Sequence, residues 1–489
     1  MADPRTETRA GYRRALGAIA SVGASSVVNT VAGIAKMKIA AVILGPAGLG
    51  TVSLLQQFIG TVSTVTSLGV GTSGTREVAA ALAAEDAKRL VATRRALTWG
   101  TLAVALVGAS LIIGARRPLA LLVMDDPLRS SELAWMSIGV ALTVMAGSHR
   151  ALVNGYRRIK DLALINALTG IVSAIIAAVS LLLWREGAVV LFVLVSPLTS
   201  FLLAAGFASR LPKATHTAVS PKCAATVWWR MAQLGVAFML SAGALSVGHL
   251  VVKTLIQREI GPDGLGLFSA AWLLSQYSTS FLFAAITADF YPRISAEPVH
   301  ESGFQTIVNE QTEMLLLVSA PILLAIMAVA PIALTVLYSA EFVGASRVLR
   351  WLVLGDVLKT AAHPLGFALL AASAGRSYLL ARVVAVSTYA GTGLLLIGSI
   401  GLPGGAIAYL GMYCVYLAIL LLLAARLLSV RWTRGICFTL LALLASGVCI
   451  ALAAQVSETW SLVIGTCLTL AWAGGATAIL YGRTKSRSS

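Results

Sequence analysis

The sequence predicts an all-α polytopic membrane protein with about 14 transmembrane helices. Of its 489 residues, 58% are hydrophobic and 12% are charged, so the apolar surface exceeds what one globular core could bury. Charged or Gly/Pro-rich points divide the chain into stretches of roughly 20 mostly apolar residues, the length of one membrane crossing. These stretches are too long for barrel strands and lack period-two alternation of polar and apolar residues, so helices are expected.

The apolar stretches give approximate helix bounds: 16–44, 51–73, 96–114, 132–155, 162–183, 188–208, 229–256, 265–290, 312–335, 346–371, 377–399, 403–425, 435–455 and 460–481. We group them into two six-helix lobes and a C-terminal pair. The predicted regions are a tail (1–15), an N-lobe (16–210), an inter-lobe linker (211–228), a C-lobe (229–427), a C-terminal pair (428–482) and a tail (483–489).

The distribution of Lys and Arg predicts the orientation. With a cytoplasmic N-terminus, 24 of the 37 Lys and Arg fall in inner segments and seven, Arg350 among them, in outer segments. The positive-inside rule then places both termini in the cytoplasm, and an even number of helices agrees. This asymmetry also accounts for most of the net charge of +17, so nucleic acid is not an expected partner.

A hexapeptide repeat suggests that the two lobes arose by duplication. Gly45-Pro46-Ala47-Gly48-Leu49-Gly50 recurs as Gly261-Pro262-Asp263-Gly264-Leu265-Gly266, at an offset of 261 − 45 = 216 residues. Each copy follows an odd-numbered helix at its outer end, which favours two lobes of parallel orientation. The alternative is a coincidental turn motif, since Gly and Pro mark tight connections generally. We expect Gly45, Pro46, Gly48, Gly261, Pro262 and Gly264 to form hinges or turns.

Six cations remain at membrane depth: Lys36, Lys38, Arg150, Lys253, Lys359 and Arg382. A cation at a helix centre costs about 2.5–3.5 kcal/mol on insertion scales, so these residues are expected to line an internal hydrated cavity. The alternative, which Arg150 fits best, is snorkelling to the headgroups. Lys253 corresponds to position 37 in the first repeat, since 253 − 216 = 37, and this symmetry favours a shared cavity for an anion such as phosphate or pyrophosphate.

Asp356, Lys359 and His363 are spaced by three and four residues and therefore lie along one face of their helix. They could form only an internal ion pair. In the functional interpretation, Asp356 or His363 takes up a proton or Na⁺ that couples to transport, because intramembrane acids often act as relays.

No catalytic, cofactor or metal signature stands out. Gly69 to Gly74 match G-x-G-x-x-G but end a membrane helix, and no P-loop occurs. The five histidines form no ligand cluster, and the five cysteines have no C-x-x-C spacing. We therefore expect no cofactor, no metal and no enzymatic activity, but a transporter.

Four segments carry a resemblance to a known family: Lys38–Gly50, Leu68–Gly71, Thr75–Glu77 and Leu354–Lys359. They resemble the polysaccharide transporter, or Wzx-like, flippases of the multidrug/oligosaccharidyl-lipid/polysaccharide exporter (MOP) superfamily. The resemblance implies two lobes around a central cavity, alternating access, and flipping of an undecaprenyl-pyrophosphate-linked oligosaccharide, such as an O-antigen or exopolysaccharide unit, across the bacterial cytoplasmic (inner) membrane. We accordingly predict substrate-binding cations at Lys36, Lys38, Arg76, Lys253, Arg293, Lys359 and Arg382.

Two other functions are weighed against this one. A MATE-like multidrug or cation antiporter would need acidic groups in its cavity, and Asp356 is the acid clearly available. A membrane glycan polymerase or ligase would carry a large periplasmic loop, which the helix pattern does not predict. The expected partners are thus the lipid-linked oligosaccharide, the bilayer, H⁺ or Na⁺, and other glycan assembly proteins.

Overall fold

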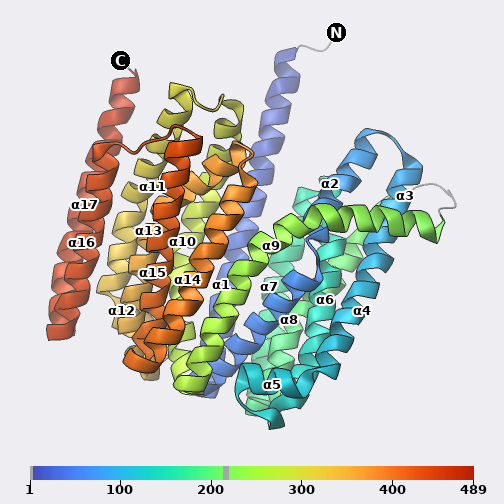
Figure 1. The fold of residues 1–489 in the computed structure, drawn as a ribbon, viewed down its shortest axis with the longest axis horizontal. Coiled ribbons are helices and arrows are strands. Elements are labelled where there is room, and N and C mark those ends of the chain that lie inside the picture. Colours follow the sequence, from blue (N-terminus) through green and yellow to red (C-terminus); the bar gives the residue numbers. More distant parts are fainter. Residues whose placement is uncertain (1–3, 213–219, 489) are drawn as a thin grey trace. The chain divides into compact units, whose positions relative to one another are not determined.

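The computed structural model describes residues 4–212 and 220–488, and all regular structure in these ranges is helical (Figure 1). The remaining residues, which include part of the predicted linker and the ends of both predicted tails, lie outside the described part. The chain forms two compact units, one up to Leu250 and one from Val251.

The first unit is built from nine helices in the described residues, the last of which continues beyond it. They are α1 (Pro4–Thr66), α2 (Val70–Ala83), α3 (Ala87–Arg95), α4 (Thr101–Gly114), α5 (Arg116–Met124), α6 (Ser130–Gly155), α7 (Ile159–Trp184), α8 (Val189–Ser209) and α9 (Pro221–Glu259).

The second unit contains eight further helices in the described residues. They are α10 (Pro262–Ala296), α11 (Ser302–Ala328), α12 (Ala330–Leu337), α13 (Ser346–Ala371), α14 (Gly375–Ile400), α15 (Leu402–Leu427), α16 (Arg434–Val456) and α17 (Glu458–Ser488).

The predicted fold class is confirmed, and the chain is a multi-pass membrane protein. Eleven segments of the described chain are long and apolar enough to cross a membrane. Two of them, Gly23–Thr66 and Ile159–Ser209, each overlap two of the predicted helices, so the predicted number of about 14 is approximate. Most predicted bounds agree with the structure to within a few residues, because the apolar stretches end at charged or Gly/Pro positions.

Helix continuity differs from the prediction in several places. The predicted helix 312–335 is divided between α11, which ends at Ala328, and α12, which begins at Ala330. The first two predicted helices are merged in α1, which continues through a kink at Gly45. The second one was expected to reach residue 73, but α1 ends at Thr66, because Leu68 and Gly69 adopt positive φ angles of 48° and 67°. α9 begins at Pro221, inside the predicted linker, since proline is well suited to the first turn of a helix.

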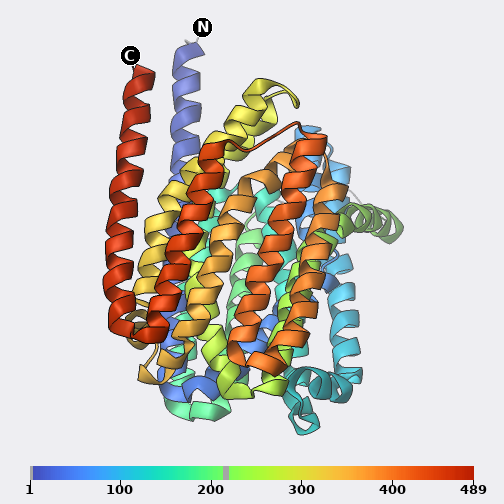
Figure 2. The ribbon, with the colours of Figure 1, turned by 60° about the vertical axis from the view of Figure 1, so that its left-hand side comes forward.

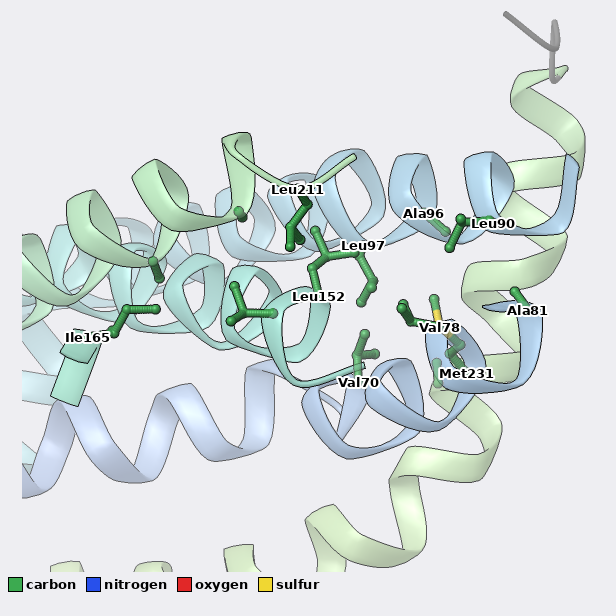
Figure 3. Packing of buried hydrophobic residues seen from close by; sticks show 14 residues of the cluster. Val70, Val78, Ala81, Leu90, Ala96, Leu97, Leu152, Ile165, Leu211 and Met231 are labelled. Atoms are coloured by element: carbon green, nitrogen blue, oxygen red, sulfur yellow. The ribbon is translucent and has the colours of Figure 1, made fainter. Parts of the chain in front are cut away.

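A hydrophobic cluster holds the first part of α9 against the first unit. Met231 of α9 packs with Val70 and Val78 of α2, Leu97 before α4, and Leu152 of α6 (Figure 3). In Figure 1 this part of α9 lies crosswise to α4 and α6. The helix is therefore joined to the unit by side-chain packing before it continues into the apolar segment Phe238–Glu259, which is long enough to cross a membrane.

The centre of the second unit is α13, which packs against α10, α11, α15 and α16. In the most apolar 18-residue stretch of this segment, 83% of the residues are buried, whereas in that of α17 only 11% are. α16 and α17 form an adjacent pair, with α17 also lying against α11 (Figure 2). Polar groups on α13 are thus shielded by protein on several sides, whereas α17 presents most of its surface outward.

Candidate functional site

The two glycine-proline repeats adopt the same local structure. Gly45 has φ 65° and ψ −169°, and Gly261 has φ 91° and ψ 179°, a left-handed region that strongly favours glycine. A proline follows each and starts the next helical segment. A Cβ on Gly48 would collide with Leu44, and one on Gly264 would collide with Ile260, in each case the residue four positions earlier. The repeat is therefore structural as well as sequential.

Lys36 is buried on α1 and turned toward α8. Its Nζ donates hydrogen bonds to the carbonyl oxygen of Phe192 at 3.1 Å and to Oγ of Ser196 at 2.8 Å. The ammonium also lies 4.4 Å from the centroid of the Phe192 ring. Lys36 is 5% exposed and pairs with no carboxylate in the described part of the chain. A buried ammonium stabilised only by neutral groups is a natural attachment point for an anion.

The other predicted cations of α1, α2, α9 and α10 occupy different environments. Lys38, two residues after Lys36, is exposed, as are Arg76 on α2 and Arg293 on α10. Lys253 is buried on α9. Together with Lys36, these are five predicted cations. The structure buries two of them, Lys36 and Lys253, and leaves the other three exposed.

Asp356 anchors a polar cluster inside the second unit. It is fully buried on α13, where Ser275 donates to its Oδ2 and the Tyr409 hydroxyl donates to its Oδ1 at 2.9 Å. Lys359 lies 3.4 Å from Oδ1 and donates to Gln276 Oε1 at 2.6 Å and Thr279 Oγ1 at 3.2 Å. The predicted proximity of Asp356 and Lys359 is confirmed, and α10 and α15 supply the other partners.

His363 and Arg382 lie in aromatic surroundings near this cluster. The His363 ring stacks on Phe283 with a centroid distance of 4.2 Å, and the Lys359 ammonium lies 5.4 Å from the centroid of the same ring. Arg382 of α14 donates to the Tyr378 hydroxyl at 3.0 Å and lies 5.9 Å from the Tyr416 ring centroid. The structure therefore links His363 to Lys359 through Phe283.

The family model described as "Polysaccharide biosynthesis protein" matches residues 17–296, more than half of the chain. The chain belongs to this polysaccharide biosynthesis family. The predicted resemblance is thereby confirmed, on a match that contains both glycine-proline repeats. A lipid III flippase of Escherichia coli (strain K12) is 25% identical to this member over 425 residues, which are 81% of this chain and 94% of that protein.

Solved structures show how this polysaccharide biosynthesis family member is folded. The lipid II flippase MurJ, in an inward closed conformation, matches with a TM-score of 0.75 at 12% identity, covering 95% of this chain and 99% of that one. An inward-facing multidrug resistance MATE family transporter of the MOP superfamily matches with a TM-score of 0.67 at 16% identity, covering 85% and 95%. The named relatives are flippases and transporters, in agreement with the prediction of a transporter.

Sequence reasoning missed three polar links in this family member. Arg350, expected in an outer segment, is buried, donates to the Met327 carbonyl at 3.2 Å and pairs with Glu458 at the start of α17. Glu77 pairs with Arg89 at 2.7 Å. Thr61 donates to the carbonyl oxygen of Ser246 at 3.1 Å, which ties α1 to α9.

No pattern in the local sequence marks these links, because the two partners of each link lie in different helices.

Proposed function

We propose that this protein is a flippase that carries an undecaprenyl-pyrophosphate-linked oligosaccharide from the cytoplasmic to the periplasmic leaflet of the bacterial inner membrane. The glycan is an O-antigen, exopolysaccharide or related repeat unit. Transport occurs by alternating access, with both termini in the cytoplasm. The protein acts as a transporter without a cofactor, and other glycan assembly proteins deliver or receive its cargo.

The observation that carries the proposal is the environment of Lys36. Its ammonium is buried in a membrane helix bundle and is held by a carbonyl, a hydroxyl and an aromatic ring. Such a charge is costly in a membrane unless an anion approaches it. A pyrophosphate supplies the missing negative charge and accepts hydrogen bonds from the amine.

The relatives support the lipid-linked nature of the cargo. The Escherichia coli protein that matches over 94% of its length is named for flipping lipid III, and MurJ is named for flipping lipid II. Both names describe a lipid that is flipped. In our proposal this lipid is a carrier with a pyrophosphate, which suits cationic side chains. In our proposal the headgroup is bound by Lys36, Lys38, Arg76, Lys253, Arg293, Lys359 and Arg382.

We assign the coupling role to Asp356, with His363 as the second candidate. Asp356 is fully buried and already contacts a cation, Lys359, so its charge state is tied to its neighbours. Uptake of H⁺ or Na⁺ at this carboxylate would change the Asp356–Lys359 contact and thereby the packing of α13 against α10.

A MATE-like antiporter of cationic drugs is the second candidate, favoured by the TM-score of 0.67 with such a transporter. The charges argue against it. Of the described residues, two carboxylates are buried, Glu77 and Asp356, and each pairs with a cation, Arg89 or Lys359. Neither is available to neutralise a cationic drug without first losing its partner.

Transport in reconstituted vesicles tests the proposal. Proteoliposomes of the full chain are loaded with fluorescent undecaprenyl pyrophosphate bearing an oligosaccharide, and exposure of the label on the opposite leaflet is followed in time. Lys36→Met keeps the length of the side chain but removes its charge, and we expect about a tenfold to hundredfold loss of rate, the effect of one charged hydrogen bond. Lys36→Arg should keep most of the activity.

Lys88→Met is the matched control, because Lys88 is exposed in the first turn of α3. Wild-type vesicles that leave the labelled lipid in its original leaflet would reject the flippase. A normal rate in the triple variant Lys36→Met, Lys38→Met, Lys253→Met would reject the cationic binding site while leaving flippase activity intact.

A further inference from the structure

A cavity of about 330 Å³ lies inside the first unit, among α1, α2, α4 and α6. It is lined mainly by hydroxyl side chains and glycines. The hydroxyls belong to Ser63, Thr64, Ser67, Thr101, Thr143 and Ser148. None of the described residues that line it is charged, so this hydroxyl cavity differs in chemistry from the cationic residues described above.

Two of the hydroxyls have no partner. Ser63 Oγ and Thr101 Oγ1 are buried and make no hydrogen bond in the described part of the chain. The two residues are 5% and 4% exposed. A buried polar atom without a partner is costly, and native proteins rarely keep one without an external ligand or water. These two hydroxyls therefore lack an internal partner, and because their oxygens expose almost no surface, a ligand in the cavity would bond to them once the side chains rotate toward it.

The remaining hydroxyls are ready to accept. Thr64 donates to the Gly60 carbonyl at 2.7 Å, Thr143 to that of Gly139 at 2.7 Å, and Ser148 to that of Met145 at 2.8 Å. Each thereby satisfies its proton within its own helix. Its oxygen lone pairs remain available to a ligand that brings donors of its own.

Glycines keep the cavity open. An ideal Cβ on Gly60 or Gly147 would meet no heavy atom within 4 Å, and both residues line the cavity. Glycine in a helix costs roughly 0.5–1 kcal/mol relative to alanine. Two such positions facing empty space indicate that volume is kept free at a cost in helix stability.

The chemistry of the cavity suits an uncharged ligand that carries both hydroxyls and apolar faces, because hydroxyl side chains and carbon surface line it together. A charged group would find no counter-charge there, and an apolar group would leave Ser63 and Thr101 unpaired. A sugar both donates and accepts, which matches a site with two donors and several acceptors. The volume equals that of about ten liquid waters, enough for one or two sugar rings.

We propose that the hydroxyl cavity binds a saccharide of the lipid-linked cargo. This inference rests on the proposed function and assigns it a second subsite: cations bind the pyrophosphate, and the hydroxyls of Ser63 and Thr101 bind the glycan. Recognition of sugars by neutral groups would let the protein read the glycan separately from the carrier lipid.

Binding to the full chain in lipid nanodiscs tests this subsite with two probes. One is undecaprenyl pyrophosphate carrying a disaccharide of N-acetylglucosamine, and the other is undecaprenyl pyrophosphate without sugar. The wild type should bind the first more tightly. The double variant Ser63→Ala, Thr101→Ala should lose about tenfold in affinity for the sugar-bearing probe, the effect of two hydrogen bonds, with unchanged affinity for the bare probe.

Gly147→Leu should produce the same selective loss by filling the cavity. Gly206→Leu is its control, because Gly206 lies on α8 with no heavy atom within 4 Å of an ideal Cβ and does not line the cavity. Removing two unpaired hydroxyls should not lower thermal stability, which separates lost binding from misfolding.

The outcomes separate the two proposals. A wild type that binds neither probe would overturn the proposed function and the subsite with it. Equal wild-type affinity for both probes, or variants that keep the wild-type preference or weaken both probes equally, would overturn the subsite alone.

Discussion

Gly69 and Gly235 touch backbone to backbone. A Cβ on Gly69 would collide with the carbonyl oxygen of Gly235, and a Cβ on Gly235 would collide with the carbonyl oxygen of Leu68. The contact brings α9 against the break between α1 and α2, where Gly69 has a φ of 67°. Two residues without side chains, 235 − 69 = 166 positions apart, thus allow the two backbones to approach each other closely.

Gly235→Ala should destabilise the protein by about 1–3 kcal/mol, because the added methyl overpacks a contact between two backbones. The thermal midpoint in detergent measures the change. Gly243→Ala, on the same helix, is the control: its ideal Cβ would meet only Val65 at an ordinary 3.9 Å. An unchanged midpoint for Gly235→Ala would contradict the close approach.

Gly45→Ala and Gly261→Ala should have similar effects, since both glycines have positive φ with extended ψ. Each substitution should cost on the order of 1–3 kcal/mol in backbone strain. Gly114→Ala serves as a control, because Gly114 has an unstrained φ and open space around its ideal Cβ. A large loss at one repeat with none at the other would show that the two turns are not equivalent.

Glu458→Gln should release α17 from α13. It leaves Arg350, 4% exposed at its side chain, buried without its carboxylate, whereas Glu458 itself is 49% exposed. We expect a loss of about 1–3 kcal/mol, the cost of a buried charged group without its partner. The double variant Arg350→Met, Glu458→Gln should be more stable than Glu458→Gln alone. If the losses of the two single variants, Glu458→Gln and Arg350→Met, simply added up in the double variant, the coupling would be contradicted.

Asp356→Asn tests ion coupling. The amide keeps the shape of the carboxylate but cannot take up a proton or hold Na⁺ as an anion does. We expect transport in vesicles to become independent of an imposed H⁺ or Na⁺ gradient and to fall by an order of magnitude or more. Glu186→Gln changes an exposed acid and should leave the gradient dependence intact. Gradient-driven transport by Asp356→Asn would assign the coupling elsewhere, with His363→Gln as the next variant.

The helices themselves follow from local sequence. The prediction of a helix over residues 346–371 matches α13 at both ends, and the glycine-proline repeats mark the turns that Gly45 and Gly261 make. Both signals are local: an apolar stretch must satisfy its backbone hydrogen bonds within itself in a membrane, and a positive φ combined with an extended ψ, as at Gly45 and Gly261, is readily adopted only by glycine.

The partners that charged side chains find in other helices depend on tertiary structure alone. Lys36 was predicted at membrane depth, but its contact with Phe192, 156 positions away, depends on how α1 packs against α8. Arg350 was expected outside the membrane region, yet it pairs with Glu458, 108 positions away. The six hydroxyls of the cavity come from α1, the turn after it, α4 and α6, and show no pattern along the chain. Hydropathy therefore determined which segments become helices, whereas packing decided which polar atoms meet, because a hydrogen bond between helices depends on their relative position and not on their composition.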